Sequence, residues 1–147
     1  MNKYIKMLEF DKIIALVKNE LVLKVNYDVL DKLNLMDDLE EIELSLNEVD
    51  EAVILQQRMG RNPIYFNVDI ASILKLVNKG GVISEEQLMH IGQLLDSIKD
   101  NIIYYDKLVD AGITGKFFYN KLSNMSYQKE LNLEIKRIIT PYGEIKD

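Results

Sequence analysis

The sequence predicts an all-α protein, a multi-helix bundle with two long amphipathic helices. Apolar residues recur at steps of three and four along most of the chain, which is the spacing that gathers side chains on one face of an α-helix. Only two prolines and seven glycines interrupt the 147 residues, and these are the residues that break helices and form turns. We therefore expect about six helices in a single helical domain that spans residues 1–147.

The first predicted helix begins around Phe10. Its apolar face consists of Phe10, Ile13, Ile14, Val17 and Leu21. Polar residues weaken the pattern from Val25 to Met36, where we expect a short helix inside a connector. The path of this connector, residues 25–36, is not determined by the pattern.

The second predicted helix opens at Asp37, whose side chain can cap free backbone N–H groups, with Glu40 in the partner position of a capping box. Its apolar residues follow heptad spacing and form a seam of Leu39, Ile42, Leu46, Val49 and Val53. Gly60 and Pro63 should end the helix near Met59. We expect the seam to pack against other helices.

The longest predicted helix follows a shorter one. After a connector through Tyr65 and Phe66, a short helix is expected from about Asp69 to Asn78, ended by the glycine pair at 80–81. Ser84 and Gln87 then form a capping box. The apolar residues after it keep a heptad rhythm: Leu88, Ile91, Leu95, Ile98, Ile102, Tyr105 and Val109. Such a seam requires an apolar partner surface, supplied by other helices of the chain or by self-association.

Two short helices and a turn complete the expected fold. Gly112 and Gly115 flank the break after the longest helix. One short helix contains Phe117, Phe118 and Leu122, and the next contains Leu131, Ile135 and Ile138. The TPYG stretch at 140–143 is a turn signal.

The composition is that of an ordinary soluble protein, and we expect a cytoplasmic one that does not contact membranes. No apolar run approaches the roughly 20 residues that span a bilayer, and the N-terminus does not resemble a secretory signal. The absence of cysteine agrees with a reducing compartment and removes thiolate metal sites and a cysteine nucleophile. A net charge of −6 disfavours binding of a phosphate backbone by the chain as a whole.

Four stretches, taken in order, carry a resemblance to a known family. They are LEFDKI at 8–13, DLEEIEL at 38–44 running on to DEA at 50–52, GGVISEEQL at 80–88, and ITPYGEIKD at 139–147. Their order and spacing together resemble the start of the second bacterial MutS paralogue, a MutS-family ATPase that carries a C-terminal Smr endonuclease domain. The resemblance spans nearly the whole chain.

The resemblance implies that this chain is the N-terminal helical core segment, and a fragment, of a protein several times its length. Such a protein is a homodimer in which core and lever helices connect an ATPase to a clamp around nucleic acid. The family is associated with DNA repair through branched or recombining DNA, and with recognising and splitting collided ribosomes. Its members lack the mismatch-reading domain of the MutS proteins of mismatch repair. The remainder of the polypeptide, and DNA or the ribosome through the full-length protein, are the partners implied.

The chain departs from the family in two places, of which the first bears on the path of the connector and the second on what the chain can do alone. The residues after the first helix read LKVNYD at 23–28, where the family has a glycine-containing stretch. No GxxxxGK[ST] phosphate-binding motif is present, so ATP and magnesium would be cofactors of the full-length protein only. We therefore expect this chain to be no enzyme and to hold no cofactor or metal of its own. The rival interpretation is a stand-alone acidic helical adaptor that binds a protein partner through an apolar groove.

Two features suggest chemistry and are better explained without it. His90, the only histidine, lies in the longest predicted helix with no base, nucleophile or further metal ligand placed beside it, so we favour a structural or surface role. The acidic cluster from Asp37 to Glu51 could offer hard ligands to a divalent cation. Most of its members occupy positions outside the seam, which favours a solvated face.

The candidate contacts with nucleic acid or a partner are cations and one tyrosine. Residues 116–121 mix lysines with aromatic residues, and Lys116, Tyr119 and Lys121 could contact stacked bases there. Packing of the aromatic residues in a core is the alternative, and the acidic balance of the chain favours it. Arg58 and Arg61 could reach a phosphate or a partner's carboxylate, or could complement the dipole at a helix end. No catalytic, cofactor-binding or metal-binding residue is predicted.

Overall fold

The structure is a computed structural model that describes residues 9–21, 30, 33, 36–64 and 68–146, and within them it confirms the all-α prediction. Its helices are α2 (Phe10–Glu20), α4 (Leu39–Met59), α5 (Ile70–Asn78), α6 (Glu85–Asp110), α7 (Lys116–Leu122) and α8 (Lys129–Ile138). The two long predicted helices are α4, with 21 residues, and α6, with 26. The predicted connectors at 25–36 and through Tyr65 and Phe66 lie largely or wholly outside the described residues.

Local capping signals place the helix starts. The Ser84 hydroxyl accepts a hydrogen bond from the Gln87 backbone N–H at 3.2 Å, and the Gln87 side chain accepts one from the Ser84 N–H at 2.9 Å, so the predicted capping box is confirmed. At α4 the prediction was one residue early. Asp38, not Asp37, accepts a hydrogen bond from the Glu41 N–H at 2.9 Å. Two successive aspartates offer the same capping chemistry, and the cap at Asp38 makes Leu39 the first helical residue.

Glycines end the long helices where the sequence predicts. Gly60 follows α4 with φ of 79°, and Gly112 lies just beyond α6 with φ of 68°. A side chain with a Cβ atom rarely adopts this left-handed region, whereas glycine enters it without steric cost. The TPYG turn is also present, because the Gly143 N–H donates to the Thr140 carbonyl oxygen at 3.1 Å. Beside this turn lies an isolated antiparallel bridge between Ile139 and Ile145.

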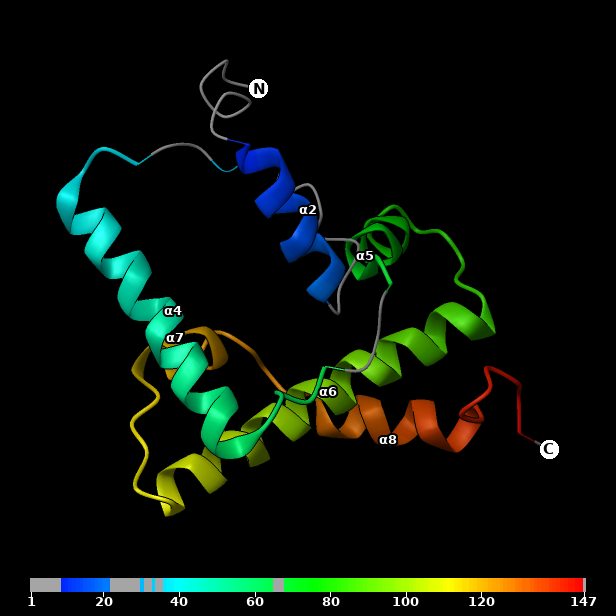
Figure 1. Ribbon diagram of the computed structural model, residues 1–147. Coiled ribbons are helices and arrows are strands. Elements are labelled where there is room, and N and C mark those ends of the chain that lie inside the picture. The colour runs from blue at the N-terminus through cyan, green and yellow to red at the C-terminus, as the bar shows by residue number, and fades with distance from the viewer. Residues whose placement is uncertain (1–8, 22–29, 31–32, 34–35, 65–67, 147) are drawn as a thin grey trace.

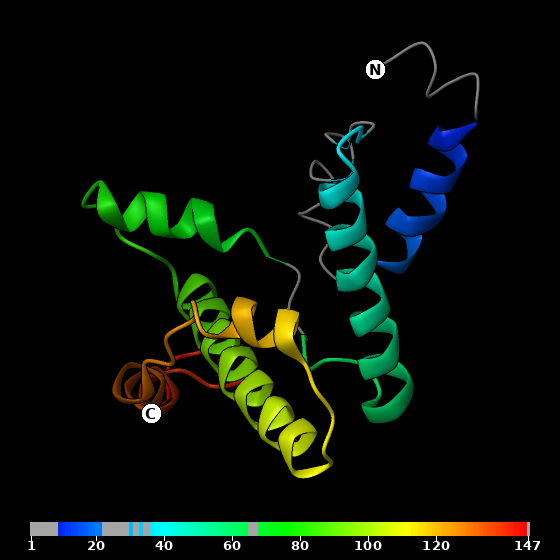
Figure 2. The same cartoon turned by 90° about the vertical axis from the view of Figure 1, so that its left-hand side faces the viewer.

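Helix α6 is the scaffold on which α5, α7 and α8 pack (Figure 1). Helix α8 runs antiparallel along it, and Figure 2 shows the pair from a second side. The two helices come close at Gly92, where an added Cβ atom would lie 3.1 Å from Cγ2 of Ile135. The buried apolar residues of the described chain come from five helices and the residue after α8: Leu55, Ile73, Leu95, Leu108, Leu122, Ile135 and Ile139. No described helix is both long and apolar enough to span a bilayer.

The helical faces agree with the predicted seams only in part. In α6 most predicted seam residues are at least partly buried, yet Val109 is exposed and its neighbour Leu108 is fully buried. In α8 only Ile135 of the three predicted apolar residues is buried, because Leu131 and Ile138 are exposed, whereas Asn132 and Ile139 are buried. Val109 was therefore wrongly placed in the packed seam of α6. Helix packing distances and crossing angles select the buried side within an apolar stripe, and the spacing alone does not contain them.

Helix α4 departs furthest from expectation. Four of its five predicted seam residues are 47% to 68% exposed, namely Leu39, Leu46, Val49 and Val53, and Ile42 is partly buried. The side of α4 that packs within the described chain is instead the one that carries Leu55. The prediction that this seam packs against other helices is thus not met by the described residues.

Truncation of Leu108 tests the observed side of α6. Leu108→Ala should lower the free energy of unfolding by about 2 to 5 kcal/mol, because it leaves a cavity in a fully buried position. Val109→Ala removes a similar apolar side chain from an exposed position and should change it by no more than about 0.5 kcal/mol. Urea denaturation followed by circular dichroism measures both values. Equal losses would contradict the burial described.

Candidate interaction surface

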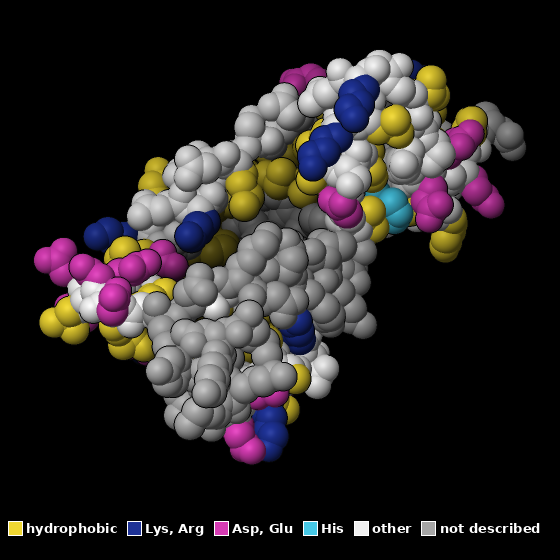
Figure 3. All heavy atoms as spheres, turned by 90° about the horizontal axis from the view of Figure 1, so that it is seen from above, with side chains coloured by type: hydrophobic (Ala, Val, Ile, Leu, Met, Phe, Trp, Pro, Cys, Tyr) yellow, Lys and Arg dark blue, Asp and Glu magenta, His cyan; other side chains and the backbone are white. Residues whose placement is uncertain are grey.

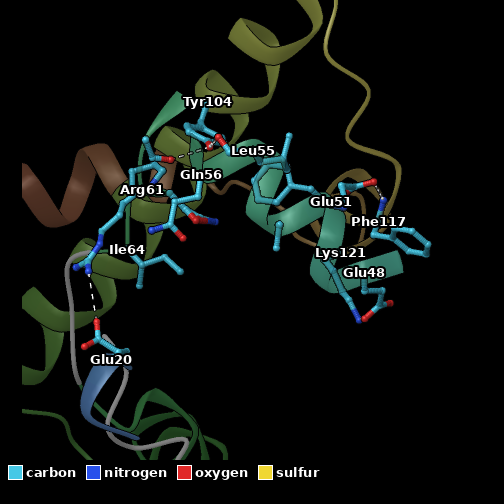
Figure 4. Close-up of a pocket in the computed structure, with 15 residues that line it drawn as sticks. Glu20, Glu48, Glu51, Leu55, Gln56, Arg61, Ile64, Tyr104, Phe117 and Lys121 are labelled. Carbon is cyan, nitrogen blue, oxygen red and sulfur yellow. Dashed lines mark hydrogen bonds and ion pairs between the residues drawn. The ribbon is translucent and has the colours of Figure 1, made fainter. Parts of the chain in front are cut away.

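An open cleft lies between α4, α7 and residues 60–64, the segment that follows α4. Its volume is about 1030 Å³. Apolar and aromatic side chains line it together with charged ones, among them Glu48, Glu51, Arg61, Tyr104 and Lys121 (Figure 4). We call it the α4–α7 cleft. It contains two of the five contact residues predicted from the sequence, Arg61 and Lys121.

Glu51 fixes the start of α7 from another helix. Its two carboxylate oxygens accept hydrogen bonds from the backbone N–H groups of Phe117, at 3.1 Å, and Phe118, at 2.8 Å. The N-cap residue of α7, Gly115, has no side chain to provide this cap. A carboxylate at a helix N-terminus satisfies free N–H groups and interacts favourably with the helix dipole. Glu51 therefore determines where α7 lies against α4.

Three side chains on one face of α6 hold the segment after α4. The Ser97 hydroxyl donates to the carbonyl oxygen of Pro63 at 2.7 Å, and the Asn101 side-chain amide donates to the same oxygen at 3.1 Å. The Tyr104 hydroxyl donates to the carbonyl oxygen of Gly60 at 3.0 Å. Burial raises the pKa of Tyr104, which keeps the phenol protonated as a donor. We call Ser97, Asn101 and Tyr104 the α6 clamp.

The aromatic residues of segment 116–121 pack against tyrosines of α6. The rings of Tyr104 and Phe118 meet edge to face with centroids 5.6 Å apart. Those of Tyr105 and Tyr119 are tilted by 34° with centroids 5.2 Å apart. Such pairs stabilise a fold beyond the area they bury. The core-packing alternative therefore has direct geometric support, although Tyr119 remains half exposed.

The predicted cationic contacts do not form one basic patch. Lys121 lies 3.7 Å from a Glu48 carboxylate oxygen, and Arg61 lies 3.8 Å from one of Glu20. Lys116 is exposed at the start of α7, and Arg58 is exposed in the last turn of α4. Because carboxylates accompany the cations of the cleft, the attraction of a phosphate backbone to this surface is weakened. Contact with nucleic acid or a partner stays a prediction for all five residues.

His90 and the acidic cluster have ordinary surroundings. The His90 ring lies 3.0 Å from the Gln93 side-chain oxygen and 3.7 Å from a Glu86 carboxylate oxygen, both on its own helix. Acidic side chains gather over the start of α4, at the left-hand edge of Figure 3. Among the described residues no three acidic, histidine or cysteine side chains are arranged to hold a metal ion. Most acidic residues of the cluster are exposed, as the solvated-face interpretation predicts, and Glu51 is an exception.

The sequence pattern did not predict either set of contacts that builds the cleft, the Glu51 cap or the α6 clamp. Glu51 was assigned to the solvated acidic face, although its partners are backbone groups far along the chain. Ser97 and Asn101 are buried polar residues in a helix recognised by its apolar seam. Their spacing of four residues, with Tyr104 three further on, was the signal that could have revealed a polar face.

Comparisons with known proteins relate nearly the whole chain to one group. It is 28% identical to "Endonuclease MutS2" of Halothermothrix orenii over 97% of this chain and 19% of that protein. It is 25% identical to "Putative endonuclease MutS2" of Bacillus subtilis over 99% of this chain and 18% of that protein. The chain thus spans about a fifth of the length of these curated relatives. No protein-family model matches it, and no solved structure matches it.

Removal of the Glu51 carboxylate should loosen the start of α7. Glu51→Ala should lower the free energy of unfolding by about 0.5 to 2 kcal/mol, as expected for loss of a helix cap. Amide hydrogen exchange at Phe117 and Phe118 should become faster, because their N–H groups lose their acceptors. Glu48→Ala, which removes the cleft's other α4 carboxylate and its ion pair with Lys121, is the matched control. Unchanged protection of both amides in Glu51→Ala would contradict the assigned cap.

Proposed function

We propose that this chain, an N-terminal MutS2-like region, is the non-catalytic helical core segment of a larger MutS2-type protein. The observation that carries the proposal is the extent of the similarity. It runs over 97% to 100% of this chain in three of the relatives, yet covers only 18% to 19% of them. A segment of this kind supplies rigid structure, and the remaining length of such a protein supplies its chemistry.

The two long helices suit a mechanical task. At 1.5 Å per residue, α4 and α6 are roughly 30 and 40 Å long. The α6 clamp and the Glu51 cap tie α4 to α6 and α7. A displacement applied at the far end of α4 would therefore reach α6 through hydrogen-bonded contacts. We propose that the segment transmits motion in this way between the ATPase domain of the longer protein and the part of that protein that closes around nucleic acid.

The activities of the longer protein are part of the same proposal. The relatives carry the name endonuclease. The resemblance described in the sequence analysis adds an ATPase and an Smr nuclease domain. ATP and magnesium would bind outside the present chain, in a homodimer located in the cytoplasm. DNA undergoing repair or recombination, or a collided ribosome, would be the substrate.

The coding sequence offers the first test. We expect the reading frame to continue past Asp147 and to encode a GxxxxGK[ST] phosphate-binding loop downstream. A stop codon directly after Asp147 would overturn the proposal and favour the stand-alone adaptor, whose apolar binding surface would then be the exposed side of α4.

Assays of two purified proteins separate structure from chemistry. The 147-residue chain should show no ATP hydrolysis and no DNA cleavage, whereas the longer polypeptide should hydrolyse ATP and lose this activity when the lysine of its phosphate-binding loop is changed to alanine. Turnover of ATP by the 147-residue chain, unaffected by further purification, would contradict the non-catalytic role.

A further inference from the structure

The exposed seam of α4 is a stripe with a defined direction. Its residues Leu39, Ile42, Leu46, Val49 and Val53, called here the α4 stripe, follow one another at steps of three and four. At about 100° per residue, Glu51 lies roughly 200° round the helix from Val49. The stripe therefore faces away from the side that Glu51 turns toward α7. In Figures 1 and 2 the first half of α4 stands clear of α6, α7 and α8.

Two carboxylates of α4 lie beside the stripe. The other four, at Glu40, Glu41, Glu48 and Glu51, lie on the remaining sides of the helix, as does its single cation, Arg58. Glu43 and Asp50 directly follow the stripe residues Ile42 and Val49, so they flank it on one side, and both are exposed. Figure 3 shows acidic and hydrophobic side chains together at its left-hand edge, over the start of α4. The surface is thus an apolar strip with an acidic border.

The acidic border formed by Glu43 and Asp50 determines which kind of helix can bind to the α4 stripe. A second copy of α4 laid against the stripe would bring an equally acidic helix to it, and like charges across an interface disfavour association. A helix with apolar residues at the same spacing and lysine or arginine beside them would bury the strip and pair the border. The chemistry required is therefore that of a basic amphipathic helix.

We propose that the α4 stripe is the seat of a basic amphipathic helix from another part of the same, longer polypeptide. This inference rests on the proposed function, because only a longer protein contains such a helix in the same chain. The length of the relatives supports that source, since about four fifths of each lies outside the similarity to this chain. The occupant is named by its chemistry: apolar at steps of three and four, with cations along one border.

Two synthetic peptides test the selection by charge. Both are helical, of the length of α4, with leucine at the seam positions. One carries lysine and the other glutamate at the positions beside the seam. The lysine peptide should bind the 147-residue chain at least about ten-fold more tightly in fluorescence anisotropy. Its affinity should fall as sodium chloride is raised, because salt screens exposed charge pairs. Equal binding of the two peptides, or binding of neither, would overturn the proposal.

A matched pair of variants tests whether the peptide binds at the α4 stripe. Val49→Asp places a charge in the stripe and should reduce binding of the lysine peptide at least about ten-fold. Leu44→Asp introduces the same charge at a residue of similar exposure, 53% against 59%, but lies roughly 140° round the helix from Val49. It should leave binding within about two-fold. Both positions are exposed, so both variants should keep the parent's circular dichroism spectrum. Equal effects of the two variants, or dimerisation of the parent that Val49→Asp abolishes, would overturn the proposed occupant.

The longer polypeptide tests the source of the helix. The 147-residue chain has no cysteine, so Val49→Cys and Leu44→Cys each introduce one thiol. Maleimide should label both quickly in this chain. In the longer polypeptide, labelling of Val49→Cys should slow at least about ten-fold while Leu44→Cys stays within about three-fold of its rate here. Equal labelling rates of Val49→Cys in the two proteins would contradict the binding of a helix of the same polypeptide to the α4 stripe. A reading frame that stops at Asp147 would instead defeat the proposed function, while the peptide measurements would still report the charge selection.

Discussion

The carbonyl oxygen of Pro63 ties the segment after α4 to the longest helix, α6. It accepts hydrogen bonds from Ser97 and Asn101, two residues of α6 that lie on one face of that helix. Tyr104, three residues further on, secures Gly60 in the same segment. Polar side chains buried in a helix are costly unless they are paired, so this pairing restricts the geometry more sharply than apolar contact would. The position of α4, and through Glu51 that of α7, depends on it.

The sequence predicted the ends of helices better than their surroundings. Capping residues and glycines act on the backbone within a few positions, so Ser84, Gly60 and Gly112 could be interpreted without tertiary structure. The buried sides of helices depend on neighbours. Leu108 replaces Val109 in the core because α6 meets α7 and α4 near Gly115, a meeting that a heptad pattern does not encode.

The cleft was harder to predict than the fold because its contacts join distant residues. Glu51 looks like any other member of an acidic helix until α7 is brought against it. Arg61 and Lys121 were identified as cations in useful positions, and the structure adds that each has a carboxylate beside it. The α4 stripe shows the converse case, in which a correctly recognised apolar face lacks the neighbour that the pattern implied.

The contact at Gly92 controls where the chain goes next. Because position 92 carries only a hydrogen, Ile135 can come close to the α6 backbone, and α8 settles along α6 at that separation. Ile139 and the turn at 140–143 follow directly from α8, and Gly143 comes to lie beside Glu86 and Met89 in the first turns of α6. An alanine at position 92 would place a methyl group against Ile135, so that the Ile135 side chain or α8 would have to move by a few tenths of an ångström.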